Sequence, residues 1–108
     1  MNKKISNMLG LAKRAGLLSG GGLAAESAVK AGKARLLVIA EDASENTRKK
    51  FSDMASYRKI PLICCGSCEE LGRSIGQGLR SSAAITDQGM ADAILKLFQT
   101  EVMKSQGE

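Results

Sequence analysis

Apolar residues follow two different spacings along this chain. Apolar positions three or four residues apart predict helices, and short unbroken apolar runs predict strands covered on both faces. The clearest run is Leu36–Ala40, which two carboxylates and several small polar residues follow. Small polar residues at such a place are typical of a helix start. In chain order, the pattern predicts a helix over 3–15, a strand over 17–19, a helix over 23–31, a strand over 35–40, a helix over 45–58, a strand over 62–65, a helix from Ser67 to Gly76, a strand over 80–86 and a helix from Thr86 or Asp87 to Thr100.

Helices and strands therefore alternate through the whole sequence. Such alternation predicts an α/β fold, a three-layer α/β/α sandwich with helices on both faces of one sheet. The first strand is short, and we expect it to pair at an edge and make the four-stranded sheet mixed. Residues 1–100 are expected to form a single domain and residues 101–108 a frayed tail.

Composition and charge narrow the function. The chain is 44% hydrophobic and 25% charged, as in soluble globular proteins. It shows no apolar run near the ~20 residues of a membrane span and no signal peptide, so we expect a cytoplasmic location. Residues 1–50 hold 10 Lys/Arg against 4 Asp/Glu, a net of +6, whereas residues 51–108 hold 6 against 7, a net of −1. A basic half favours a polyanionic partner, first of all nucleic acid, over a merely solvated surface.

A glycine run, Gly20–Gly22, precedes the second predicted helix. Glycine lets backbone amides approach a ligand closely, and a helix N-terminus attracts anions. The run matches neither a Walker motif nor a dinucleotide-binding fingerprint. It therefore predicts either a phosphate-binding loop or a flexible turn. The first interpretation needs cations nearby, and Lys30 and Lys33 lie one to two turns further along the same helix.

A second glycine-rich loop follows the fourth predicted helix, with Arg73 before it and Arg80 after it. Leu79 is a candidate apolar contact for an unstacked base, and the two arginines are candidate phosphate ligands. The alternative is a plain helix stop that leads into a strand. Aromatic residues make up only 3% of the chain, which excludes RNA-binding domains that stack bases on an aromatic sheet. RNA binding would then rest on amides, cations and shape.

Two further groups of residues are candidates for a chemical role. Glu41 and Asp42 predict either a site for Mg²⁺ or base contacts, or helix capping, and too few carboxylates converge there for metal catalysis. Cys65 and Cys68 form a C-x-x-C motif at a strand-to-helix junction, as in dithiol redox sites. The chain has no histidine, so its three cysteines cannot complete a four-ligand zinc site. Structural, reduced cysteines are the main interpretation, and a thiol redox or metal-handling protein is the alternative.

Four segments in order carry a resemblance to a known family. They are LLSGGG…AVKAGKARLLVIAEDAS, IPLI, EELGRSIG and AAITDQG. Together they resemble the ribosomal L7Ae/L30e family, in particular its small bacterial members, over about residues 4–98. The resemblance implies a ribosomal or ribosome-associated protein that binds structured RNA such as a kink-turn or rRNA. It also implies no catalysis, no cofactor and no small-molecule substrate.

The resemblance further implies that RNA lies against the second helix, the start of the third and the loop after the fourth. Kink-turn readers of the family place an Asn-Glu pair and then a Lys where this chain has Leu23, Ala24 and Ser27. Leucine and alanine make no base-edge or phosphate contacts, so a protein-interaction module that has lost RNA binding is a further alternative. The candidate RNA-binding residues are Gly20, Gly21, Gly22, Ser27, Lys30, Lys33, Ser44, Arg48, Arg73, Leu79 and Arg80.

Overall fold

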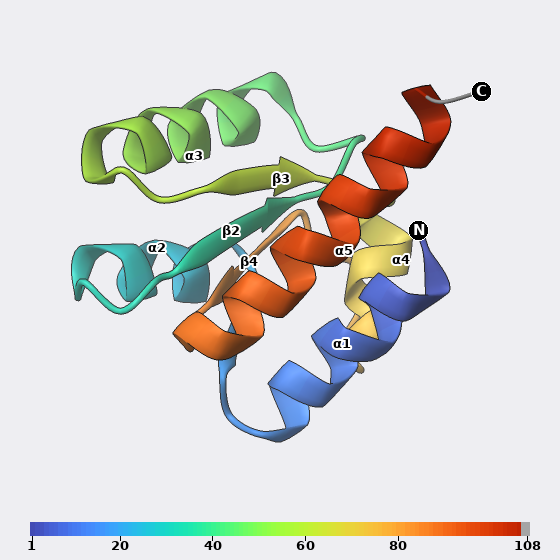
Figure 1. The fold of residues 1–108 in the computed structure, drawn as a ribbon. Coiled ribbons are helices and arrows are strands. Elements are labelled where there is room, and N and C mark those ends of the chain that lie inside the picture. Colours follow the sequence, from blue (N-terminus) through green and yellow to red (C-terminus); the bar gives the residue numbers. More distant parts are fainter. Residues whose placement is uncertain (107–108) are drawn as a thin grey trace.

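The computed structural model describes residues 1–106, with side chains as far as Met103, and shows helices and strands alternating in the predicted order (Figure 1). The fold is α/β, as the sequence predicts, with a mixed four-stranded sheet. None of the helices in the described part combines the length and low polarity needed to cross a bilayer. The elements are α1 (Lys3–Arg14), β1 (Leu18–Gly20), α2 (Gly22–Lys30), β2 (Leu36–Ile39), α3 (Glu45–Arg58), β3 (Leu62–Cys64), α4 (Cys68–Ser74), β4 (Ser82–Ile85) and α5 (Gln88–Gln106).

The strand order in the sheet is β1-β4-β2-β3. β2 pairs with β3 in parallel, and β4 runs antiparallel to both β1 and β2. The short first strand therefore lies at an edge, as predicted. β2 and β4 occupy the interior of the sheet, and all four residues of each are buried. Coverage on both faces accounts for the continuous apolar residues of β2 and for those that follow Ser82 in β4.

Side chains of β2 alternate between two hydrophobic cores. Leu36 and Val38 pack with residues of α1, α4 and α5, whereas Leu37 and Ile39 pack with residues of α2 and α3. This alternation is the period-two geometry of a strand. Figure 1 shows α5 lying across the sheet beside α1, whereas α2 and α3 lie away from these two helices. The sheet is therefore the middle of three layers.

The direction of α2 and α3 determines which helix ends share a surface. Each helix runs in the direction opposite to β2, because α2 leads into the start of β2 and α3 follows the end of β2. The Gly21 amide donates to the Ser82 carbonyl at 2.8 Å, and the Ala40 amide donates to the Ser81 carbonyl at 2.9 Å. Both helix N-termini therefore lie at one end of the sheet, next to the start of β4. Both C-termini lie at the other end.

Local side chains cap the helices as the sequence indicates. Ser67 and Glu70 form the predicted capping box of α4, and Asp87 accepts from the Met90 amide at 2.9 Å at the start of α5. The structure differs at the other end of α5, which continues as helix to Gln106 where a frayed tail was expected from residue 101. The Asn2 side chain donates to Glu101, so a contact with the chain start holds this turn. Residues 107–108 lie outside the described part of the chain.

Candidate nucleic-acid interface

The N-terminus of α2 presents backbone amides that no side chain caps. Gly21 occupies the N-cap position with a φ of 100°, a conformation that side-chain-bearing residues rarely adopt. The first amide to bond back into the helix there is that of Ala25, which donates to the Gly21 carbonyl at 2.9 Å. Amides of a first helical turn have no partner inside the helix. These donors and the helix dipole together favour an anion at this place.

The loop between α4 and β4 lies directly beside these amides. The two segments share a surface hollow of about 620 Å³, here called the glycine hollow. Among the residues that the structure describes, no carboxylate lines the hollow, and the single charged residue in its wall is Arg80. Segments almost 60 positions apart in the sequence thus form one cationic surface. Its lining residues are Gly20, Gly21, Gly22, Leu23, Ala24, Ser27, Leu79, Arg80 and Ser81.

Arg80 is held in place against the glycine run. A Cβ on Gly21 would lie 3.3 Å from the Arg80 Cδ, so the arginine side chain runs along the Gly21 backbone. Its Nε donates to Gln77 Oε1 at 3.2 Å, and its Nη1 donates to the Leu79 carbonyl at 2.8 Å. A guanidinium fixed in this way needs little further ordering to bind a phosphate.

Two large apolar side chains flank the same hollow. Leu23 is 83% exposed and Leu79 is 70% exposed. Leu23, Ala24 and Ser27 all lie at the surface, where the family's base-reading side chains were expected. The hollow therefore offers amides, one guanidinium and apolar surface rather than base-edge hydrogen-bonding side chains.

Gly72 and Gln77 support this surface, although neither is among the candidate residues predicted from the sequence. A Cβ on Gly72 would lie 1.9 Å from the Gly78 carbonyl oxygen, so the loop packs directly on the backbone of α4. The Gln77 amide also donates to the Gly72 carbonyl at 2.8 Å. A glycine inside a helix carries a stability cost, which is the signal that would have pointed to Gly72 as a close-packing position.

Ser44 and Arg48 lie at the same end of the sheet but outside the glycine hollow. Ser44 caps α3, since its hydroxyl oxygen accepts from the Thr47 amide at 3.2 Å. Arg48 donates to the Glu41 carbonyl across the turn before the helix. Both residues are exposed, so they can extend a surface that begins at the glycine hollow.

The other candidate cations do not meet at the glycine run. The Lys30 ammonium pairs with Glu26 at 3.2 Å, and Lys50 pairs with the same carboxylate at 2.7 Å. These hydrogen bonds, from Lys50 first, lower the pKa of Glu26. Lys33 follows the C-terminus of α2, at the opposite end of the sheet. The cation beside the glycines is therefore Arg80 rather than Lys30 or Lys33.

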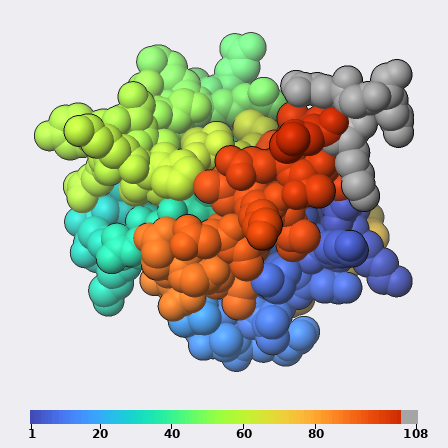
Figure 2. Space-filling view, in the orientation of Figure 1, coloured from blue at the N-terminus to red at the C-terminus, as the bar shows by residue number. Residues whose placement is uncertain are grey.

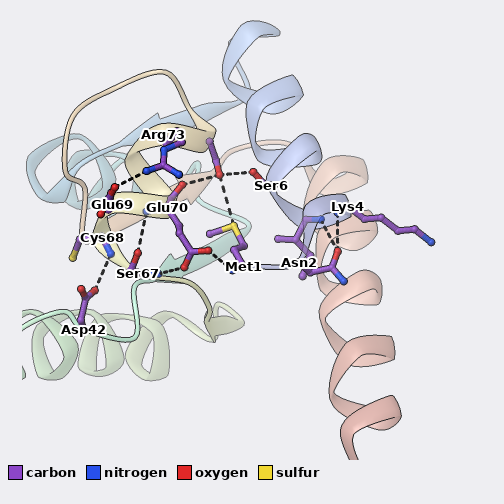
Figure 3. Close-up of polar contacts among 12 residues, drawn as sticks. Met1, Asn2, Lys4, Ser6, Asp42, Ser67, Cys68, Glu69, Glu70 and Arg73 are labelled. Atoms are coloured by element: carbon purple, nitrogen blue, oxygen red, sulfur yellow. Dashed lines mark hydrogen bonds and ion pairs between the residues drawn. The ribbon is translucent and has the colours of Figure 1, made fainter.

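Figure 3 shows the region around the start of α4, where the acidic and thiol candidates meet. Asp42 Oδ1 accepts from the Cys68 amide at 2.8 Å, and hydrogen bonds from the side chain and amide of Cys68 lower the pKa of Asp42. Arg73 pairs with Glu69 one turn earlier on the same helix, and both side chains are largely exposed. Asp42 thus satisfies an amide of the first turn of α4, whereas the sequence predicts capping of the helix that begins after Ser44, which Ser44 itself caps.

The thiols lack the activation that a redox site needs. Burial raises the pKa of the Cys65 thiol to about 11, and burial together with the Asp42 side chain raises the pKa of Cys68. Dithiol redox sites depend on a lowered thiol pKa. Within residues 1–106, no group of three His, Cys, Asp or Glu side chains is placed to hold a metal ion.

Comparison with known proteins decides the family. The profile of the ribosomal protein L7Ae/L30e/S12e/Gadd45 family matches residues 3–95. The chain belongs to this family. Within it, the chain is 40% identical over 91 residues to a Bacillus subtilis (strain 168) protein, covering 84% of this chain and 91% of that one. It is 36% identical over 97 residues to an Enterococcus faecium protein, covering 90% and 93%. Both relatives are named RNA-binding protein YlxQ.

Two solved structures share the fold of this chain. A protein of unknown function from Bacillus halodurans superposes with a TM-score of 0.86 at 32% identity, covering 91% of this chain and 99% of that one. The 15.5 kD RNA-binding protein of Giardia lamblia superposes with a TM-score of 0.77 at 21% identity, covering 93% and 92%. The second likeness concerns the fold alone.

Proposed function

We propose that this protein binds structured RNA of the kink-turn or a similarly bent type, as a non-catalytic cytoplasmic protein associated with the ribosome. Family membership and two relatives named as RNA-binding proteins support RNA as the partner. The observation that carries the proposal is the position of Arg80 and Leu79 beside the uncapped amides of α2. These are the groups that a phosphate and an unstacked base require.

The glycine hollow favours a bent RNA over a straight duplex. The α2 amides and Arg80 can bind phosphate oxygens of neighbouring nucleotides, and Leu79 can pack against a base that has left the stack. A bend brings a crowded backbone and unstacked bases close together, whereas a regular duplex offers backbone alone. We infer that recognition depends chiefly on RNA shape.

The side chains at the start of α2 limit how well the protein can distinguish one RNA sequence from another. Leu23 and Ala24 cannot form the bidentate base contacts that are each worth about 1–3 kcal/mol. Ser27 supplies a hydroxyl but no charge. We therefore expect affinity to change little when base pairs beside the bend are exchanged for others of the same geometry.

A binding assay with matched RNAs tests the proposal. Fluorescence anisotropy would compare a kink-turn hairpin with a straight duplex of equal length in 0.15 M salt. We expect at least tenfold tighter binding to the kink-turn, and roughly tenfold weaker binding by Arg80→Ala, from the loss of a charge-assisted contact. Arg14→Ala removes the same charge from the exposed end of α1 and should change affinity less than threefold.

Equal affinity for both RNAs would refute shape recognition and leave only non-specific attraction. In that case the exposed Leu23 and Leu79 would favour a protein partner. Crosslinking in cells, followed by sequencing of the bound RNA, tests the ribosomal part of the proposal. Enrichment of ribosomal RNA is the expected result, and its absence would contradict ribosome association.

A further inference from the structure

A second cationic hollow lies at the opposite end of the sheet from the glycine hollow. It has a volume of about 1000 Å³ and is enclosed by the C-terminal ends of α2 and α3, the approach to β3 and the first residue of α5. Figure 2 shows these segments meeting at one side of the molecule. Arg35, Arg58 and Lys59 line it together with Tyr57, and no carboxylate of the described part of the chain does. We call it the arginine hollow.

The three cations of the arginine hollow are not neutralised by protein carboxylates. None of them takes part in an ion pair among the described residues. Arg35 Nη1 donates to the Gly32 carbonyl at 3.4 Å, a long contact that leaves its other donors for a ligand. Three unpaired cations around one concavity attract a polyanion.

Lys59 is a charged residue at a backbone position that favours glycine. It follows α3 in the left-handed conformation, with a φ of 58°, and is the one non-glycine residue with positive φ in the described part of the chain. Glycine or asparagine is usual at such a helix end, because other residues pay a conformational cost there. A lysine at this place adds a cation to the hollow at the expense of local stability.

Tyr57 gives the hollow an aromatic face. Its side chain is 86% exposed, and it is the single tyrosine of a chain that has no tryptophan. Tyr57, Arg58 and Val29 also line a smaller hollow of about 270 Å³ between α2 and α3, together with Lys30, Met54 and Asp53, whose carboxylate pairs with Lys49 at 3.1 Å. The two hollows therefore form one groove with Tyr57 between them. An extended ligand fits this arrangement better than a single small anion.

Helix dipoles account for part of this arrangement only. Cations at the ends of α2 and α3 offset the partial negative charge of the helix C-termini. That effect gives no reason for an exposed aromatic ring beside them. Proteins that bind single-stranded RNA combine a cationic groove with aromatic rings on which bases stack.

We propose that the arginine hollow is a second RNA-binding surface, which holds a single-stranded segment with its phosphates on Arg35, Arg58 and Lys59 and a base on Tyr57. The inference rests on the proposed function in that the partner is RNA, but it concerns a different surface. The nine residues of α2, Gly22–Lys30, span roughly 13 Å at 1.5 Å per helical residue. One RNA that carries a bend and a single-stranded flank can therefore reach both hollows.

Intrinsic fluorescence tests this site directly, because Tyr57 is the only tyrosine and tryptophan is absent. The intact protein would be titrated with a twelve-nucleotide oligouridylate, with N-acetyltyrosinamide as the correction for light absorbed by the RNA. We expect saturable quenching of Tyr57 by base stacking. A twelve-residue polyglutamate, which has charge but no bases, should bind at least tenfold more weakly.

Two substitutions and one control test whether the cations of the arginine hollow, and not the overall positive charge of the protein, bind the RNA. Arg58→Gln and Lys59→Gly should each weaken oligouridylate binding about three- to tenfold and lower the salt slope by roughly 0.7. Lys59→Gly relieves the left-handed conformation, so its melting temperature should stay the same or rise, which excludes unfolding as the cause. Lys4→Gln removes one charge from the start of α1, where the side chain points away from the contacts in Figure 3, and should change binding less than twofold.

The outcomes distinguish this inference from the proposed function. Absence of saturable quenching, unchanged affinity in both variants, or equal binding of polyglutamate would overturn the second site. Kink-turn binding without oligouridylate quenching would overturn the second site alone. Oligouridylate quenching without kink-turn preference would support the second site and refute the proposed function.

Discussion

Replacing Gly72 by alanine tests whether direct backbone packing on α4 holds the loop that carries Leu79 and Arg80. The added Cβ would lie 1.9 Å from the Gly78 carbonyl oxygen and 2.7 Å from its carbon, where real contacts are rarely below 3.0 Å. The loop must therefore retreat by about 1 Å, the difference between 1.9 and 3.0 Å. Because the opposing atoms belong to the backbone, no side-chain rotation relieves the contact.

Two effects of opposite sign determine the size of the change. Overpacking of this kind costs about 1–3 kcal/mol, and here the overlap is severe enough for the upper part of that range. Alanine inside a helix is favoured over glycine by about 1 kcal/mol. The free energy of unfolding should therefore fall by roughly 1–2 kcal/mol, and the melting temperature by on the order of 5–10 °C.

Gly78→Ala in the same loop is the matched control. A Cβ on Gly78 meets no atom within 4 Å, and its φ is not positive, so this substitution should leave stability unchanged or raise it by up to about 1 kcal/mol. Urea unfolding followed by far-ultraviolet circular dichroism measures both variants. Kink-turn affinity, measured where both are folded, should fall severalfold in Gly72→Ala alone.

The result that would refute this reasoning is a Gly72→Ala protein as stable as the unaltered chain. Helix propensity would then outweigh the contact, and the loop would not rest on α4 as closely as the structure indicates. Loss of stability with full RNA affinity would instead show that the positions of Leu79 and Arg80 do not depend on this packing.

Three further results are expected. The Ser82 hydroxyl is buried and finds no hydrogen-bond partner among the described residues, so Ser82→Ala should raise the free energy of unfolding by about 1 kcal/mol. A lower free energy of unfolding in urea would contradict this. The folded-state pKa of Asp42 is lowered, so its contribution is present above its usual pKa near 3.8 and is lost as pH falls through the folded value. The stability difference between Asp42→Ala and the unaltered protein should accordingly be constant above about pH 5 and vanish in stronger acid, whereas a difference that grew in acid would exclude this role. Cys64 is exposed, whereas Cys65 is buried and its pKa is raised. A thiol reagent at pH 8 should therefore label Cys64 first and Cys65 only on unfolding. Fast labelling of Cys65 in the folded protein would instead favour the thiol redox alternative.

Local chemistry made much of the fold predictable. Ser44, Ser67 and Asp87 each cap a helix through the amide three positions further on, so the caps can be identified from a few neighbouring residues. The run Leu36–Ala40 predicts a doubly covered strand because its apolar residues show no alternation. The position of the glycine run was found for the same reason, since glycines before a helix are visible in the sequence. The assignment of residues 1–100 to one RNA-binding domain stays a prediction.

Contacts between segments that are distant along the chain could not be predicted from the sequence. Lys30 and Lys33 were the expected cations because they are near the glycines along the chain, but a helix carries residues away from its N-terminus by 1.5 Å per position. Arg80 meets the glycines instead, because β4 starts beside the end of β1, which leads into the glycine run. The exposure of Tyr57 likewise depends on where α3 ends against its neighbours.

The sequence by itself determined the order of the elements, their caps, the double coverage of β2 and a surplus of positive charge in the first half. These properties depend on spacing and on neighbours within one or two helical turns. The tertiary structure alone decided the strand order, the partner of the glycine run and the two cationic hollows at opposite ends of the sheet. Such features arise because packing of two apolar cores brings together segments that local interactions leave independent.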